Sequence, residues 1–247
     1  FHALERVMAD AMSFGVLDEI WCVGDIVGYG PDPTACVSEL IDAAYLGTRV
    51  VAIAGNHDRA ATGGLSTSNF NPAAKRAAQW TTDRLDGRTH TYLERLREIE
   101  VAGQFTIVHG SPADPLWAYT THPEDALDCL FTVKTAHCIV GHTHTPSLFE
   151  LAPAASSVRP GLPEHVPFAM GGVSELQPGS RYVVNPGSVG QPRDGDPRAA
   201  YVLYEETRSA SQSLQLRRVE YDIGAVQARM RELGLPDVLA TRLSFGR

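Results

Sequence analysis

Two histidines, His142 and His144, lie two residues apart in the segment VGHTHTP, directly after a short apolar run. Imidazole nitrogens bind divalent transition metals, and two imidazoles at this spacing can point to a common place. A single histidine has many structural uses, so the pair gains meaning from other metal-type ligands in similar positions. The pair therefore predicts a metal site if the fold delivers further ligands to the same place.

Further ligands of this kind follow other apolar runs. Asp25 ends the run EIWCVGD, Asn56, His57 and Asp58 follow RVVAIAG, and His109 follows FTIV. In an open α/β sheet, residues beyond the carboxyl ends of parallel strands gather at one edge. Carboxylate, amide and imidazole ligands without thiolates suit a divalent transition ion, and this many suit a pair of ions about 3.5–4 Å apart that act on phosphoesters. Any one of these residues alone is more simply a capping or turn residue.

The elements that must position these ligands can be read from the apolar pattern. Asn71 is a typical helix N-cap, and Thr121 with Glu124 three residues later is typical of a capping box. Alternating strands and helices favour an α/β fold with a largely parallel sheet. A buried strand followed by a loop is expected in each of residues 19–25, 49–58, 105–110 and 137–144, and helices are expected over residues 33–45, 71–85 and 121–131.

The pattern changes after Leu148. Residues 152–167 are rich in proline, alanine and serine and predict an exposed loop. The segment NPGSVGQPR either forms only a tight turn or walls the site with Arg193 near the substrate. Three strands are then expected over residues 181–185, 199–206 and 214–222, and an amphipathic helix over residues 223–235.

Composition narrows the class of protein. The 247 residues carry a formal net charge of −8, which argues against a stable nucleic-acid partner because phosphate backbones are bound by Lys and Arg. The four cysteines form no CxxC motif, so reduced thiols in the cytoplasm are expected rather than disulfides or zinc ligands. No apolar run approaches the ~20 residues of a membrane span.

Five motifs in order resemble those of the calcineurin-like metallophosphoesterases, in their small prokaryotic phosphodiesterase branch. These motifs are GDIVGYGPDP, GNHD, HGSP, GHTH and NPGSVGQPRDGDP, and they run from Gly24 to Pro197. The resemblance implies a single domain over residues 1–247, folded as a four-layer α-β-β-α sandwich of two mixed sheets with flanking helices. It also implies two divalent ions, with Mn, Fe, Zn and Ni left open.

The resemblance further implies a role for each motif residue. Asp25 would bridge the ions, Asn56, His109 and His142 would complete one ion, and His144 would belong to the other. His57 would face the phosphate and support the leaving group, with Asp58 orienting its ring. The implied activity is hydrolysis of a small-molecule or nucleotide phosphoester, expected to be a phosphodiester, by a metal-activated water.

One family motif has no counterpart here. The family begins with a strand ending in Asp-x-His, whereas this chain opens with FHALERVMAD, which resembles the helix after that motif. The domain is therefore expected to lack its first strand, leaving the second ion with two protein ligands. A non-catalytic binding or regulatory module with a degenerate metal site is the alternative function. A protein Ser/Thr phosphatase is a weaker one, because GHTH and GDIVGYG look unlike that branch.

Overall fold

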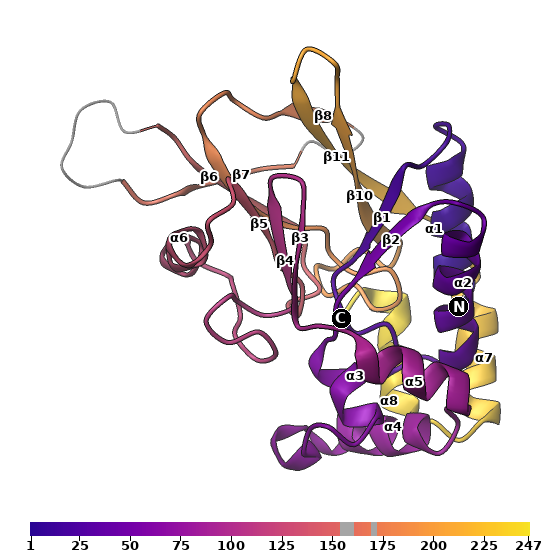
Figure 1. Ribbon diagram of the computed structural model, residues 1–247. Helices are drawn as coiled ribbons and strands as arrows, with labels where there is room; N and C mark the ends of the chain where they lie inside the picture. Colours follow the sequence, from indigo (N-terminus) through magenta and orange to yellow (C-terminus); the bar gives the residue numbers. More distant parts are fainter. Residues whose placement is uncertain (154–160, 169–171) are drawn as a thin grey trace.

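The computed structural model describes residues 1–153, 161–168 and 172–247 and has the predicted α/β class (Figure 1). The strands are β1 Glu19–Cys22, β2 Arg49–Ala52, β3 Ile99–Ala102, β4 Phe105–Val108, β5 His137–Ile139, β6 Ser147–Leu151, β7 Glu164–Val166, β8 Val173–Glu175, β9 Arg181–Asn185, β10 Ala199–Glu206 and β11 Gln212–Val219. The α-helices are α1 His2–Met12, α2 Pro33–Tyr45, α3 Asn56–Ala61, α4 Pro72–Thr82, α5 Gly87–Arg95, α6 Pro123–Thr132, α7 Ile223–Glu232 and α8 Asp237–Thr241. Two short 3₁₀ helices are η1 Thr67–Asn69 and η2 Arg242–Phe245. None of the helices in these described ranges is both long and apolar enough to cross a bilayer.

The largest sheet has six strands in the order β3-β4-β5-β9-β6-β7. Strands β4, β5 and β9 run parallel, whereas β3 pairs antiparallel with β4, β6 with β9, and β7 with β6. The sheet is therefore mixed rather than largely parallel, because the chain after residue 146 returns through hairpins instead of helical crossovers. Helix α6 covers one face, where Leu130 packs with Val108 and Phe149.

Two smaller sheets complete the strand layers. Strands β1 and β2 form a parallel pair, and β10, β11 and β8 form an antiparallel sheet. Phe105 of β4 is fully buried, and Trp21 of β1 and Tyr204 of β10 lie against it with ring centroids 5.3 Å and 5.0 Å away. The small sheets thus share one apolar core with the six-stranded sheet. The described residues form three hydrogen-bonded sheets where two were expected.

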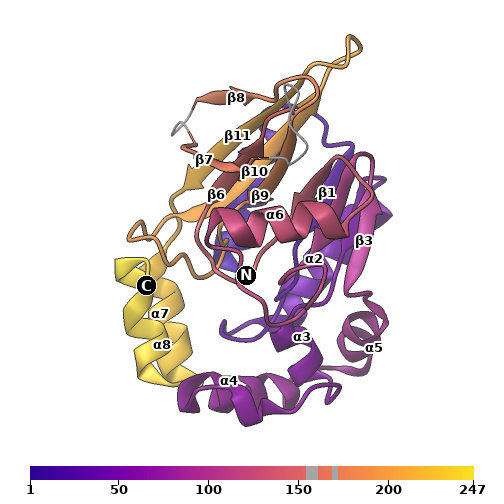
Figure 2. The same cartoon turned by 90° about the vertical axis from the view of Figure 1, so that its left-hand side faces the viewer.

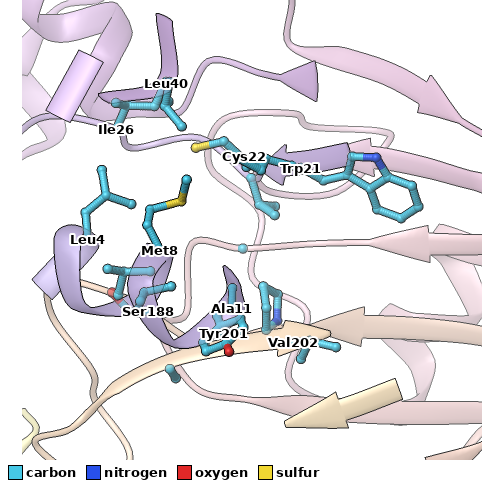
Figure 3. Close-up of a pocket in the computed structure, with 18 of the residues that line it drawn as sticks. Leu4, Met8, Ala11, Trp21, Cys22, Ile26, Leu40, Ser188, Tyr201 and Val202 are labelled. Atoms are coloured by element: carbon cyan, nitrogen blue, oxygen red, sulfur yellow. The ribbon is translucent and has the colours of Figure 1, made fainter. Parts of the chain in front are cut away.

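A large cavity separates β1 from β10. It has a volume of about 1010 Å³ and is lined by α1, β1, β10 and the loop after β1. Leu4 and Met8 of α1 face it from one side, and Trp21 and Cys22 from another (Figure 3). Within the described residues, β1 pairs only with β2 and β10 only with β11, so each keeps one edge without a β-ladder along this cavity.

Helix α1 packs on the sheet of β10, β11 and β8. Its apolar face buries Val7 against Ala199 and Val219. Asp10 accepts a hydrogen bond of 2.7 Å from the Tyr201 hydroxyl and pairs with Arg217 at 3.2 Å. Helix α1 therefore stays attached to β10 and β11 although the cavity lies beside it.

Helices α3, α4, α5, α7 and α8 lie at one end of the sheets, at the bottom of Figure 2. Helix α4 packs on α7 and α8, with Trp80 and Met230 buried between them. The Asn71 side chain accepts the Ala74 N–H at 2.9 Å, so the predicted N-cap of this helix is confirmed.

Three local predictions need correction. Helix α6 begins at Pro123, two residues after the predicted start at 121, and Asp125 rather than Glu124 accepts the N–H groups of Thr121 and His122, at 2.9 and 3.0 Å. Strand β7 occupies part of the segment predicted as an exposed loop; residues 154–160 of that segment lie outside the described residues. Asn56, His57 and Asp58 were expected in a loop but form the first turn of α3.

Candidate metal centre

The ligand-bearing loops meet at the carboxyl ends of parallel strands, as the sequence predicts. Asp25 follows β1, His109 follows β4 and His142 follows β5. Their ligand atoms all lie within 4.8 Å of one another. These three residues are called the three-ligand cluster below. Residues that are 33 to 117 positions apart in the printed sequence thus offer one carboxylate and two imidazoles to one point.

Two glycines allow the loops after β1 and β2 to approach this closely. A Cβ at Gly24, where φ is +81°, would lie 2.7 Å from Gly55 N and 2.9 Å from His109 Nδ1. A Cβ at Gly55 would collide with the backbone and carboxylate of Asp25. Any larger residue at either position would therefore push Asp25 away from His109.

The backbone is also unusual at the ligands themselves. Asp25, His142 and His144 have φ values of 51°, 61° and 60°, and they are three of four non-glycine residues with positive φ among the described residues. Asp and His tolerate the left-handed region better than most residues, but it still raises the energy of the chain. Strain of this kind at three predicted ligands is typical of a site whose geometry serves function.

Hydrogen bonds select which imidazole nitrogen each histidine presents. His109 Nδ1 lies 2.8 Å from the carbonyl oxygen of Val23 and donates to it, so Nε2 is left without a proton in the neutral ring. That Nε2 lies 3.1 Å from His142 Nδ1 and 3.4 Å from Asp25 Oδ2. His144 Nδ1 donates in the same way to the Gln191 carbonyl at 2.7 Å, which leaves its Nε2 able to bind a metal.

Buried polar atoms at the cluster lack hydrogen-bond partners among the described residues. Two of them, Asn56 Oδ1 and His142 Nε2, can act as acceptors. Both residues line a small cavity of about 100 Å³ together with Asp25 and His144. Buried acceptors without partners are costly, and a cation satisfies both. The donor set and these orphaned atoms therefore fit a divalent ion.

The pKa values of the cluster residues favour the binding of a cation. Burial opposes the charge of Asp25, yet His109 and His57 hold the pKa of its carboxyl far below the ordinary value. Burial lowers the pKa of His142 to about 4 and that of His144 to about 3, with help from His109 and Arg193 respectively. Burial also acts against a proton on His109, but the Asp25 carboxylate outweighs it and the pKa of His109 is raised. At neutral pH the centre thus holds a carboxylate and neutral His142 and His144 rings.

His57 lies beside the cluster with its ring between two aromatic side chains. Its ring centroid is 4.2 Å from that of Tyr29 and 4.7 Å from that of Phe70, and its buried Nδ1 has no hydrogen-bond partner in the part of the chain that the structure describes. Burial lowers the pKa of His57. Its backbone N–H donates to Asp25 Oδ1 at 2.9 Å, which ties the position of His57 to the cluster.

The hydrogen bonds of the Asp58 carboxylate, among the described residues, go to the backbone rather than to the His57 ring. Its two carboxylate oxygens accept the N–H groups of Val27 at 3.0 Å and Gly55 at 2.9 Å. Burial, with the nearby Asp25 charge, raises the pKa of this carboxyl to about 7. Asp58 therefore fixes the backbones of the two loops that carry Asp25 and His57.

His144 lies apart from the three-ligand cluster but on the same cavity. Arg193 lines this cavity as well, and its backbone N–H donates to the His144 carbonyl at 3.1 Å. The structure thus favours the second interpretation of NPGSVGQPR, in which the segment forms a wall of the site. Among the described residues, no group of three or more His, Cys, Asp or Glu ligands includes His144.

Four aromatic residues at the cavity were not found from the sequence. Tyr29, Phe70, Trp117 and Tyr119 line it, and three of them come from the loops over residues 58–71 and 111–123. Aromatic residues in loops follow no periodic pattern, so only the motifs could have indicated them: Tyr29 lies within GDIVGYG, and the other three follow GNHD and HGSP along the chain.

Comparison with known proteins agrees with this geometry. The model of the calcineurin-like phosphoesterase superfamily domain matches residues 1–209. An uncharacterized protein of Methanocaldococcus jannaschii, MJ0912, is 32% identical over 251 residues, covering 100% of this chain and 93% of that protein.

Two crystal structures resemble the fold over the whole chain. A metallophosphoesterase from Sphaerobacter thermophilus has a TM-score of 0.80 at 42% identity, with 100% of this chain and 94% of that chain covered. Hypothetical protein PH1004 from Pyrococcus horikoshii OT3 has a TM-score of 0.77 at 18% identity and the same coverage, and shows the shared fold alone. The chain therefore belongs to the calcineurin-like phosphoesterase superfamily.

Proposed function

We propose that the protein is a binuclear metal-dependent phosphoesterase that hydrolyses a phosphodiester of a small molecule or nucleotide. The observation that carries the proposal is the three-ligand cluster beside the orphaned Asn56 Oδ1, in a cavity that also holds His57. The relative from Sphaerobacter thermophilus, itself called a metallophosphoesterase, supports the same class of chemistry. The formal net charge of −8 supports a small substrate rather than a nucleic-acid chain, and the four free cysteines suit the cytoplasm.

The proposed ligand roles follow the donor set. Asp25 bridges two sites, Asn56, His109 and His142 complete the first, and His144 contributes to the second. Divalent ions bound there supply positive charge for the phosphate oxygens and acidify water. Manganese, iron, zinc and nickel all accept this combination of imidazole, carboxylate and amide ligands.

His57 is proposed to act on the phosphate rather than on a metal. Its ring lies at the cavity, its Nδ1 makes no hydrogen bond, and its backbone is held by Asp25. A ring in this position can hold a proton for the departing alkoxide or stabilise charge on the phosphate. Asp58 is proposed as a positioning residue that acts through the N–H groups of Gly55 and Val27.

The second ion site is proposed to need a strand that carries Asp-x-His. The cavity between β1 and β10 offers two strand edges without a β-ladder and apolar walls from α1 and β1. A strand placed there would join the two small sheets into one, and so produce the four-layer sandwich of two mixed sheets. Its carboxyl end would lie next to Asp25 if it ran parallel to β1.

The proposed activity is tested by hydrolysis of a chromogenic phosphodiester with Mn²⁺. We expect turnover that a chelator abolishes and that Asp25→Ala reduces to background, because Asp25 holds both ions. Asp42→Ala, which changes an exposed carboxylate on α2, is the matched control and should keep the wild-type rate. Metal binding without turnover on any phosphomonoester or phosphodiester would instead favour the binding or regulatory module.

A further inference from the structure

The cavity beside the cluster has an aromatic rim that the proposed hydrolysis does not require. Phe70 and Trp117 meet edge to face, with ring centroids 5.5 Å apart and an interplanar angle of 84°. Both side chains are partly exposed, and Tyr119 next to them is 54% exposed. Exposed aromatic rings beside a polar, buried centre are typical of a surface that a ligand covers.

The rim residues have different relations to the histidines. Tyr119 stacks on His142 with ring centroids 4.4 Å apart, so part of its surface supports a ligand residue. Trp117 lies farther out, 6.3 Å from the His142 ring. Phe70 touches His57 with one side and Trp117 with another. The Phe70–Trp117 pair thus lies outside the ligand layer, where the organic part of a phosphoester would extend.

Hydrogen bonds order the backbone that carries these rings. The backbone N–H of Trp117 donates to Asp114 Oδ1 at 3.3 Å, and the backbone N–H of Asp114 donates to Ser111 Oγ at 3.2 Å. Phe70 is fixed between η1 and the Asn71 cap of α4. Rings that are already ordered lose little conformational entropy on stacking, so their contribution to affinity is larger.

We propose that the substrate's ester group carries a planar aromatic ring, such as a nucleobase or an aryl group, which stacks on Phe70, Trp117 and Tyr119. The proposal rests on the proposed function only in placing the phosphate at the three-ligand cluster. Stacking needs no fixed hydrogen-bond pattern, because every aromatic ring has a π-face. The exposed side-chain amide of Asn69 lines the same cavity and can add hydrogen bonds to the polar edge of a base.

The test compares phosphate monoesters with and without an aromatic ring. Calorimetric titration of the Mn²⁺-loaded protein with adenosine 5′-monophosphate and ribose 5-phosphate isolates the base, and benzyl phosphate tests a simple aryl group. We expect the two ring-bearing ligands to bind about 10- to 100-fold more tightly than ribose 5-phosphate. Tighter binding of the nucleotide than of benzyl phosphate would assign the ring to a nucleobase, and equal binding to any aryl group.

Variants separate stacking from support of the histidines. Trp117→Leu should lose about tenfold in affinity for the ring-bearing ligands and leave ribose 5-phosphate unchanged, and Phe70→Leu should act in the same direction. Tyr45→Leu, which changes a 90% exposed aromatic residue on α2, is the matched control and should alter none of these affinities. Equal wild-type affinity for all three phosphates would overturn the proposal, as would an equal loss for ribose 5-phosphate in Trp117→Leu.

The outcomes also separate this proposal from the proposed function. Ring-dependent binding without hydrolysis of any ester would contradict the phosphoesterase activity and leave the aromatic subsite in place. Hydrolysis with the same kcat/KM for esters with and without an aromatic ring would support the phosphoesterase activity and contradict the aromatic subsite.

Discussion

The two sides of the candidate centre differ in how many ligands the described residues supply. The three-ligand cluster unites Asp25, His109 and His142, and the orphaned Asn56 oxygen faces the same cavity. On the other side, His144 lies on that cavity but belongs to no group of three or more such ligands among the described residues. The difference follows from sheet topology, because β1, β2, β4 and β5 each deliver a ligand loop, while the space between β1 and β10 contains no described strand.

Metal occupancy gives the largest expected contrast between the two sides. In the 247-residue chain, we expect one ion to bind Asp25, Asn56, His109 and His142 strongly, and the other to be weak because only Asp25 and His144 hold it. Anomalous scattering from a crystal grown with Mn²⁺ should show one strong peak near His109 and His142 and a weak or missing peak near His144.

Filling the cavity should remove that contrast. Fusing an upstream segment that ends in Asp-x-His should strengthen the peak near His144 and raise phosphodiesterase activity strongly. The same segment with both ligand residues changed to alanine is the control, since it fills the cavity without adding ligands. Two equally strong peaks in the 247-residue chain, or equal rates with and without the added ligands, would contradict the comparison.

His57 provides a second contrast, between binding and turnover. His57→Ala should reduce turnover about 10²–10⁴-fold, the usual contribution of a positioned acid–base group, with metal content nearly unchanged. Asp25→Ala should lose metal as well. Metal analysis and kcat of both purified variants check this, with the exposed His165→Ala as control. A loss of metal in His57→Ala as large as in Asp25→Ala would assign His57 to the metal instead.

Lowering the pH should change metal affinity gradually, by the smallest step of the effects predicted here. The metal-free protein holds a proton on His109 below its raised pKa, whereas His142 and His144 stay neutral down to pKa values of about 4 and 3. Lowering the pH through the pKa of His109 should therefore weaken metal binding by about tenfold per pH unit, because one proton is displaced. Competition against a chelator from about pH 8 to pH 5 measures this slope. A slope near zero would mean that His109 does not bind the ion.

The sequence predicted the residues of the centre better than their contacts. Asp25, His109 and His142 could be placed together because each follows an apolar strand, and the carboxyl ends of parallel strands share an edge. The backbone role of Asp58 could not be predicted, because it depends on how closely the loops at Gly24 and Gly55 approach. That approach is a property of tertiary packing.

The secondary structure likewise includes elements that the sequence predicted and elements that it missed. Helix α2 and strands β9 and β10 have the predicted bounds, since their apolar periodicity is regular. Strands β3 and β7 were missed because Glu100 and Glu164 interrupt the apolar pattern in short edge strands. The antiparallel additions to the large sheet were missed because strand direction depends on the length and path of connections rather than on local pattern.

The left-handed backbone at Asp25, His142 and His144 serves metal binding but lowers the thermal stability of the metal-free protein. Each such residue raises the energy of the native chain by about 1–3 kcal/mol, a cost that glycine would largely avoid. Selection for heat resistance in the presence of a chelator should therefore enrich glycine or asparagine at these three positions. The same selection with Mn²⁺ present should preserve the original residues, because ligand binding to the native state offsets the strain. The centre thus constrains how far the chain can be stabilised while it keeps its ions.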